Sequence, residues 1–120
     1  MGRPRVLFVE DEFLIRMTLS EAMADEGFDV AEAGSGDEAL EMLREERFAL
    51  LLTDVQLPGE LDGLSLVGRA RDIDPGLPVI YMTGRPDTMP NLLDPSMETV
   101  IPKPYVPSAV CAAARRMVRT

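Results

Sequence analysis

Short apolar runs alternate along the chain with segments in which apolar residues recur every three or four positions. The runs cover residues 6–9, 49–53, 79–82 and 100–101, and a further short strand is expected at 29–32. Near-continuous apolar runs are typical of strands buried on both faces, as in a parallel sheet covered by helices. The alternation therefore predicts a doubly wound α/β fold of five strand–helix units.

The segments between the runs carry the 3.6-residue period of amphipathic helices. Ser35 with Glu38 forms a capping box before the second helix, and Asp62 is a suitable N-cap for the third. Gly27 ends the first helix and 74–76 ends the third. The predicted buried stripes are Ile15, Leu19, Ala22 and Met23; Ala39, Met42 and Leu43; Leu66, Val67, Ala70 and Ile73; and Val110, Ala113, Ala114, Met117 and Val118.

The segment from Gly84 to Thr99 is the least regular part of the pattern. It contains Pro86, Pro90 and Pro95. Because a proline inside a helix costs about 3 kcal/mol, at best a short or broken fourth helix is expected here.

Length and composition describe one ordinary globular domain over residues 1–120, with 28% charged and 46% hydrophobic residues. Cys111 is the only cysteine, so no disulfide forms within the chain. No apolar run approaches the roughly 20 residues of a membrane span, and no signal peptide precedes Val6. We therefore expect a cytoplasmic protein without membrane contact.

The net charge and the absence of histidine exclude several classes of function. The net charge is −9, from 21 acids and 12 bases, and there is no histidine. Direct nucleic-acid binding is disfavoured because it depends on basic patches. A zinc site or a nucleophilic triad is also disfavoured, which leaves oxygen-ligand metal chemistry suited to Mg²⁺ or Ca²⁺.

Five reactive side chains follow apolar runs: Glu10, Asp11, Asp54, Thr83 and Lys103. In a parallel sheet the ligand site lies outside the carboxyl ends of the strands, so we expect these side chains to meet at one edge. Three crowded carboxylates repel one another. A divalent cation together with the lysine ammonium would bring the formal charge of the cluster to zero.

The order of these motifs resembles the receiver domain of two-component response regulators. Glu10-Asp11 follows the first strand, Asp54 the third, Thr83-Gly84 the fourth and Lys103-Pro104 the fifth. The resemblance covers nearly the whole chain and implies a flavodoxin-like strand order, 2-1-3-4-5. It also implies that Asp54 is the phosphoacceptor and that the bond before Pro104 is cis.

The same resemblance assigns further roles. Asp11, Asp54 and the backbone carbonyl of Gln56 would bind Mg²⁺, with Glu10 acting mostly through water. Thr83 and Lys103 would stabilise the phosphoryl oxygens. The side chains of Gln56 and Arg85 would flank the path of attacking water. Such a protein catalyses only its own phosphorylation and dephosphorylation and is otherwise not an enzyme.

Two features depart from the common receiver pattern. Val100 stands three positions before Lys103, where most receivers carry an aromatic switch residue. The segment 81–86 resembles an atypical receiver group named for a Phe-Ala-Thr-Gly motif, which lacks that switch and has an irregular fourth helix. The loop 58–63 is one residue longer than the commonest version, another trait of that group. Thr83 is then the expected element that couples phosphorylation to the signalling surface.

The chain has no kinase-type glycine-rich loop, so the phosphoryl donor is expected to be a separate protein. The resemblance to receiver domains implies that this donor is a histidine kinase or a phosphotransfer protein. No output domain follows Thr120, which indicates either a stand-alone regulator with a downstream partner or a receiver from a longer protein. One alternative is a Mg²⁺-dependent phosphohydrolase of the haloacid-dehalogenase type, although the Asp-x-Asp pair of those enzymes does not follow Val9. Another is a receiver that acts only by docking, without phosphorylation.

Overall fold

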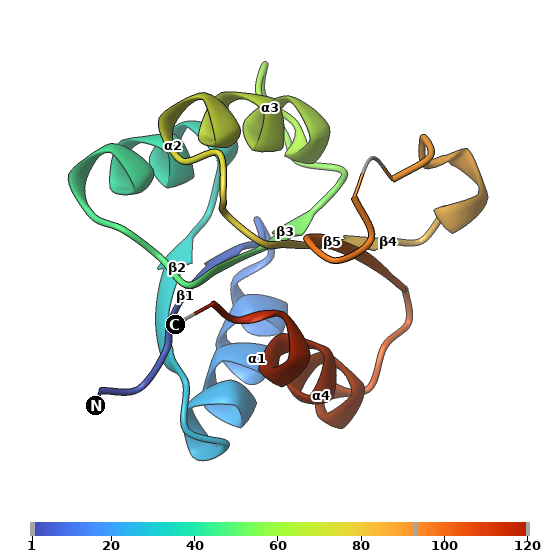
Figure 1. Ribbon diagram of the computed structural model, residues 1–120. Coiled ribbons are helices and arrows are strands. Elements are labelled where there is room, and N and C mark those ends of the chain that lie inside the picture. The colour runs from blue at the N-terminus through green and yellow to red at the C-terminus, as the bar shows by residue number, and fades with distance from the viewer. Residues whose placement is uncertain (1, 93, 120) are drawn as a thin grey trace.

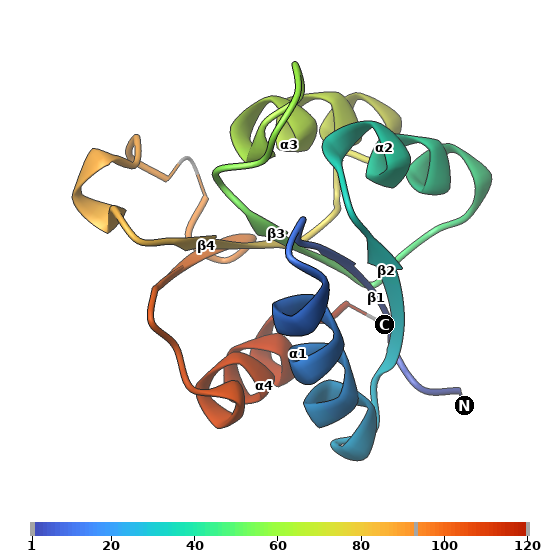
Figure 2. The same ribbon diagram turned by 180° about the vertical axis from the view of Figure 1, so that it is seen from behind.

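A five-stranded parallel sheet lies between two layers of helices in the computed structural model, which describes residues 2–92 and 94–119 (Figures 1 and 2). The strands are β1 (Arg5–Val9), β2 (Asp29–Ala33), β3 (Leu50–Asp54), β4 (Val79–Thr83) and β5 (Glu98–Pro102). Their order in the sheet is β2-β1-β3-β4-β5, and all neighbouring pairs are parallel. The predicted fold and strand order are confirmed.

Four α-helices cover the sheet. Figure 1 shows α1 (Phe13–Asp25) and α4 (Pro107–Met117) on one face, and α2 (Gly36–Glu45) and α3 (Gly63–Ile73) on the other. Side chains of β1 alternate between the two cores, with Leu7 packed on the α2 and α3 side and Phe8 on the α1 and α4 side. Both faces need apolar side chains, which explains the near-continuous apolar runs. Within residues 2–92 and 94–119, none of the helices combines the length and the apolar character of a membrane span.

Two helix starts form as their sequences predict. The Ser35 hydroxyl accepts a hydrogen bond from the Glu38 N–H at 3.1 Å, and Asp62 Oδ1 accepts one from the Ser65 N–H at 2.8 Å. The Glu38 carboxylate reaches back to the Gly34 N–H at 2.6 Å, whereas a standard capping box would use the N–H of Ser35. The helix start is therefore stabilised one residue earlier than expected.

Two residues predicted to be buried are exposed. Ile15 lies in the first turn of α1 and is 37% exposed, and Ile73 is the last residue of α3 and is 43% exposed. The helical period identifies the inward face of a helix, but not how far along the helix the sheet covers that face. Both residues lie at helix ends, where that coverage stops.

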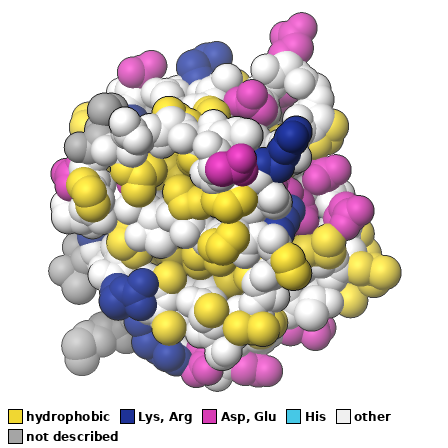
Figure 3. All heavy atoms as spheres, turned by 90° about the vertical axis from the view of Figure 1, so that its right-hand side faces the viewer, with side chains coloured by type: hydrophobic (Ala, Val, Ile, Leu, Met, Phe, Trp, Pro, Cys, Tyr) yellow, Lys and Arg dark blue, Asp and Glu magenta, His cyan; other side chains and the backbone are white. Residues whose placement is uncertain are grey.

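Between β4 and β5 the described chain forms only one short regular element, the 3₁₀ helix η1 (Pro86–Thr88). The predicted irregular fourth helix is thus reduced to a single turn. This segment stands out from the side of the sheet in Figure 1. Figure 3 views the molecule from that side and shows a wide area of hydrophobic side chains with charged groups around it.

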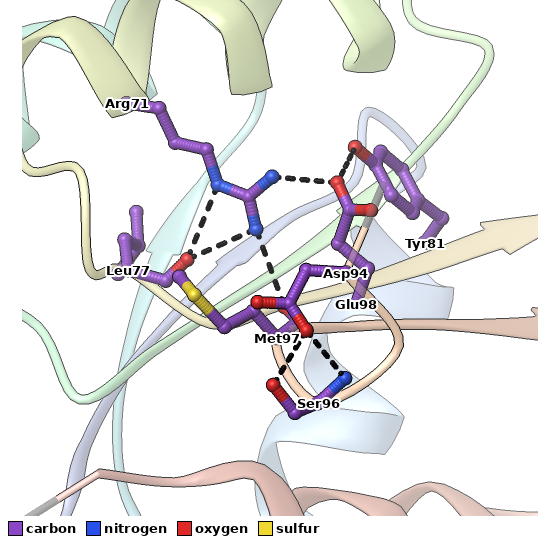
Figure 4. Close-up of polar contacts among 7 residues, drawn as sticks. All are labelled: Arg71, Leu77, Tyr81, Asp94, Ser96, Met97 and Glu98. Atoms are coloured by element: carbon purple, nitrogen blue, oxygen red, sulfur yellow. Dashed lines mark hydrogen bonds and ion pairs between the residues drawn. The ribbon is translucent and has the colours of Figure 1, made fainter. Parts of the chain in front are cut away.

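An arginine from α3 holds the far end of this segment (Figure 4). Arg71 donates to the Glu98 carboxylate at 2.5 Å and to the backbone oxygens of Leu77 and Met97, each at 3.2 Å. The Tyr81 hydroxyl lies 3.4 Å from the same carboxylate. These bonds connect α3 to the start of β5.

Candidate functional site

The carboxyl edge of the sheet brings the three predicted acids together. Glu10 and Asp54 are buried, with 1% and 5% exposure, whereas Asp11 is exposed. One carboxylate oxygen from each lies within 4.8 Å of the others. Bonds of about 2.1 Å in an octahedral Mg²⁺ site place opposite oxygens about 4.2 Å apart, so this donor set fits such an ion with small adjustments.

Asp54, the last residue of β3, contacts the predicted lysine directly. Its Oδ2 accepts a hydrogen bond from Lys103 Nζ at 2.6 Å, and its Oδ1 accepts one from the Gln56 N–H at 3.4 Å. The same ammonium lies 3.8 Å from Glu10 Oε1. One cation therefore serves two of the three acids.

Thr83 is the last residue of β4, and Lys103 directly follows the neighbouring strand β5. The Lys103 N–H donates to the Thr83 carbonyl at 2.7 Å, and the Lys103–Pro104 bond is cis, as predicted. The Thr83 hydroxyl is buried and accepts a hydrogen bond from the Arg85 N–H at 3.0 Å. A hydroxyl that accepts in this way keeps its own hydrogen for a further acceptor.

Gln56 and Arg85 take part in this contact network through their backbone N–H groups. The side chains of Gln56 and Arg85 are exposed. Val100 pairs with Tyr81 across β4 and β5 and packs, half-buried, against the core on the α2 and α3 side. Its side chain therefore lies on the face of β5 that packs against this core.

Burial and charge perturb the Glu10 carboxyl. Loss of solvent is the main reason that its pKa rises to about 7, and the hydrogen bond and negative charge of Asp54 add to this rise. The Lys103 ammonium opposes the rise, and Asp11 adds to it. Burial, together with the charges of Glu10 and Asp54, also raises the pKa of Tyr105 to about 12. The edge is a strongly anionic site that favours a bound cation.

The raised pKa of Glu10 predicts a pH-dependent stability of the metal-free protein. Between pH 4.5 and 7 the folded protein holds the Glu10 proton more tightly than the unfolded chain. The free energy of unfolding should therefore fall as the pH rises through this window. Denaturant unfolding with a chelator present should show this slope in the wild type and a weaker one in Glu10→Gln. The exposed-site control Glu21→Gln should keep the wild-type slope, and equal slopes in all three proteins would contradict the assignment.

Gly63 is a site residue that the sequence pattern did not single out. A β-carbon added there would lie 2.2 Å from the Asp54 carbonyl oxygen and 2.7 Å from Val55 Cα. Its N–H donates to the Val55 carbonyl at 2.9 Å. A glycine directly after an N-cap, where helix geometry does not require one, was the available signal. The close approach of α3 to the end of β3 depends on it.

An apolar hollow of about 640 Å³ adjoins the site on its α1 side. It is lined by Leu14, Ile15, Thr18, Leu19, Lys103, Pro104, Tyr105 and Pro107. At its rim Phe13, Leu14 and Val106 are 61%, 69% and 61% exposed. Lys103 is the residue that this hollow shares with the site.

Comparison with known proteins identifies relatives of the chain. The model of the response regulator receiver domain matches residues 6–115. The response regulator receiver protein CpdR of Brucella abortus is 42% identical over 80 residues, covering 67% of this chain and 66% of that protein. The DNA-binding response regulator MtrA of Mycobacterium tuberculosis is 34% identical over 119 residues. That match covers 98% of this chain and 51% of MtrA, so the chain spans about half the length of that relative.

Solved structures agree with this relationship. The receiver domain of the hybrid histidine kinase CckA superposes with a TM-score of 0.82 at 30% identity, covering 96% of this chain and 99% of that one. The response regulator TrrA of Thermotoga maritima, solved with Mg²⁺ and BeF, gives 0.83 at 25% identity, covering 97% and 98%. From residue 6 to residue 115, the chain belongs to the family of response regulator receiver domains.

Proposed function

We propose that Asp54 of this receiver accepts a phosphoryl group from a separate protein. The observation that carries the proposal is the buried Asp54 carboxylate with Lys103 Nζ at 2.6 Å. A carboxylate oxygen can attack phosphorus and form an acyl phosphate while the bond from phosphorus to the donor breaks. The chain then catalyses only its own phosphorylation and dephosphorylation, and otherwise acts as a signalling protein.

The neighbouring groups suit this transfer. Negative charge on the phosphoryl oxygens would be stabilised by the Lys103 ammonium, the free hydrogen of the Thr83 hydroxyl and the Gln56 N–H. Glu10, Asp11, Asp54 and the backbone carbonyl of Gln56 would hold Mg²⁺, which supplies positive charge beside the transferred group when bound. The fit of the three carboxylates to an octahedral ion supports this choice of metal.

The donor that we propose is a histidine kinase or a histidine phosphotransfer protein, which receivers use as a family. It would dock on the exposed apolar side chains of Phe13, Leu14 and Val106, because Leu14 lines the same hollow as Lys103. Such a partner implies a cytoplasmic location. The signal would pass to a downstream protein or to an output domain, and the chain itself would not contact nucleic acid.

We further propose that the chain is an atypical receiver without an aromatic switch. Three features support this assignment: Val100 at the position of the switch residue, the 81–86 motif, and a 3₁₀ turn instead of an α-helix between β4 and β5. Phosphorylation would draw the Thr83 hydroxyl toward a phosphoryl oxygen and move Arg85, whose N–H is bonded to that hydroxyl. The segment from 85 to 97 would respond most, since few regular hydrogen bonds hold it.

Thr83→Ala should separate phosphorylation from this response. Asp54 and its lysine contact remain in the variant, so it should still accept a phosphoryl group. Hydrogen exchange of residues 85–97 should then change on addition of Mg²⁺ and beryllofluoride in the wild type, but little in the variant. Thr18→Ala on α1 serves as the control, because Thr18 is exposed and lies outside the measured segment. A full response in Thr83→Ala would exclude Thr83 as the coupling element.

Arg85→Ala is expected to shorten the lifetime of the phosphorylated protein. The guanidinium can pair with a phosphoryl oxygen or obstruct attacking water beside it, and alanine can do neither. The decay of phosphorylated protein, followed by phosphate release, measures this effect. A lifetime equal to or longer than that of the wild type would refute the role of Arg85.

Titration with Mg²⁺ and beryllofluoride, followed by NMR, tests the function as a whole. Amide shifts at the acidic edge report the site, and shifts in residues 85–97 report the switch. A receiver that acts only by docking would show neither. The match of residues 6–115 to the receiver family already counts against the phosphohydrolase alternative.

A further inference from the structure

Arg16 of α1 contacts the backbone that carries the first two acids. Its Nη1 donates to the Glu10 carbonyl oxygen at 2.7 Å, and its Nε donates to Glu32 Oε1 of β2 at 3.1 Å. The guanidinium also lies over the Phe13 ring, 5.6 Å from its centre. Its side chain is only 17% exposed, so the group is held from three sides.

These contacts fix the orientation of the peptide group between Glu10 and Asp11. The Glu10 N–H is bonded to the Ala33 carbonyl at 3.1 Å, which places the end of β1. The next peptide has its carbonyl bonded to Arg16 and its N–H, that of Asp11, bonded to Glu10 Oε2 at 3.1 Å. Because a peptide group is planar, the arginine helps to set the direction in which the Asp11 side chain leaves the backbone. Asp11 is exposed and so depends on this support more than Glu10 does.

We propose that Arg16 is a positioning residue that holds the Asp11 carboxylate in place for a divalent cation, acting through the Glu10 carbonyl. This inference rests on the cation site in the proposed function. Groups that orient metal ligands from outside the first coordination layer commonly affect affinity by about 10- to 100-fold when replaced.

An electrostatic role and a positioning role of Arg16 predict opposite changes in Mg²⁺ affinity when the residue is replaced. If Arg16 acted only as a nearby positive charge, its removal would strengthen Mg²⁺ binding by lowering repulsion. If it positions Asp11, its removal should weaken binding. The direction of the change therefore separates the two roles.

Gly34 offers a second perturbation that keeps the arginine. A β-carbon at Gly34 would lie 3.1 Å from Arg16 Nη1, so Gly34→Ala should push the guanidinium away from the Glu10 carbonyl. Arg16→Lys keeps the charge, but a single ammonium lacks the rigid fork that reaches both oxygens. Arg44→Met is the control for loss of one positive charge, since Arg44 pairs with the exposed Glu41 on its own helix, α2.

The experiment measures Mg²⁺ affinity by NMR titration, together with amide exchange of Asp11 in the metal-free protein. We expect about tenfold weaker binding in Arg16→Met, partial recovery in Arg16→Lys and a loss of severalfold in Gly34→Ala. Arg44→Met should bind as the wild type does or slightly more tightly. In metal-free Arg16→Met the Asp11 amide should exchange faster than in the wild type, while the melting temperatures of the two proteins should be similar.

Unchanged or tighter Mg²⁺ binding in Arg16→Met would overturn the positioning role, as would an equal loss in Arg44→Met. If Arg16→Met does not fold, Gly34→Ala decides by the same measurements. If the wild type itself binds no Mg²⁺, the proposed function fails. In that case the metal-free exchange at Asp11 still decides whether Arg16 orders this peptide.

Discussion

Asp54→Asn is expected to abolish phosphorylation by a small donor such as acetyl phosphate in the presence of Mg²⁺. The amide lacks the negative charge of the carboxylate and is a far weaker nucleophile, so no acyl phosphate should form. Its nitrogen also cannot replace a carboxylate oxygen as a ligand for a hard cation. Intact-mass analysis should show a phosphoryl adduct on the wild type and none above background on the variant.

The matched control for this experiment is Asp72→Asn, because Asp72 is an exposed acid on α3. It should be phosphorylated as the wild type is. Removal of Mg²⁺ with a chelator should suppress the adduct in both the wild type and the control. An adduct of wild-type abundance on Asp54→Asn would show that another residue is the main acceptor.

Gly63→Ala should destabilise the fold and disturb the site together. The added β-carbon would meet two backbone atoms, the Asp54 oxygen at 2.2 Å and Val55 Cα at 2.7 Å, neither of which can rotate away. Either α3 or the end of β3 must therefore move. Overpacking of this kind costs about 1–3 kcal/mol, and we expect a value near the upper end because backbone is displaced. Urea unfolding gives the stability, and the Mg²⁺ and beryllofluoride response gives the site.

Gly68→Ala on the same helix separates this contact from the general effect of glycine in a helix. Nothing lies within 4 Å of a β-carbon at Gly68. Alanine favours the helix by about 1 kcal/mol, so this variant should be as stable as the wild type or more so. If Gly63→Ala were equally stable and responded normally, close approach would not be the reason for glycine at this position.

The main elements of the fold could be predicted because their signals are local. The residues that lead to Asp54 are apolar from 49 to 52, and β3 is buried along its whole length. The side chains of Ser35 and Asp62 accept bonds from N–H groups three residues later, and such bonds need no tertiary contact. Ile15 could not be predicted in this way. Its exposure depends on how α1 is placed over the sheet, which the local pattern does not show.

Some features of the candidate site could likewise be predicted from the sequence, and others depend on tertiary structure. Its acids, hydroxyl and lysine could be found from the sequence because each follows a strand, and parallel strands end at one edge. The difference between buried Glu10 and exposed Asp11 depends on which face of the sheet end each side chain meets. The raised pKa of Glu10 follows from that burial and from Asp54, a residue more than forty positions away along the chain.

The sequence by itself therefore determined which reactive residues follow each apolar run and where several helices begin. It also determined that prolines keep the segment between β4 and β5 from forming a regular α-helix. Tertiary structure alone decided the contacts between segments distant along the chain. It brought Lys103 to 2.6 Å from Asp54, α3 against the Asp54 carbonyl at Gly63, and Arg16 onto the Glu10 carbonyl. The physical reason is that hydrogen-bonded caps and apolar periodicity act over a few residues. Close approach and burial instead depend on how whole helices pack on the sheet.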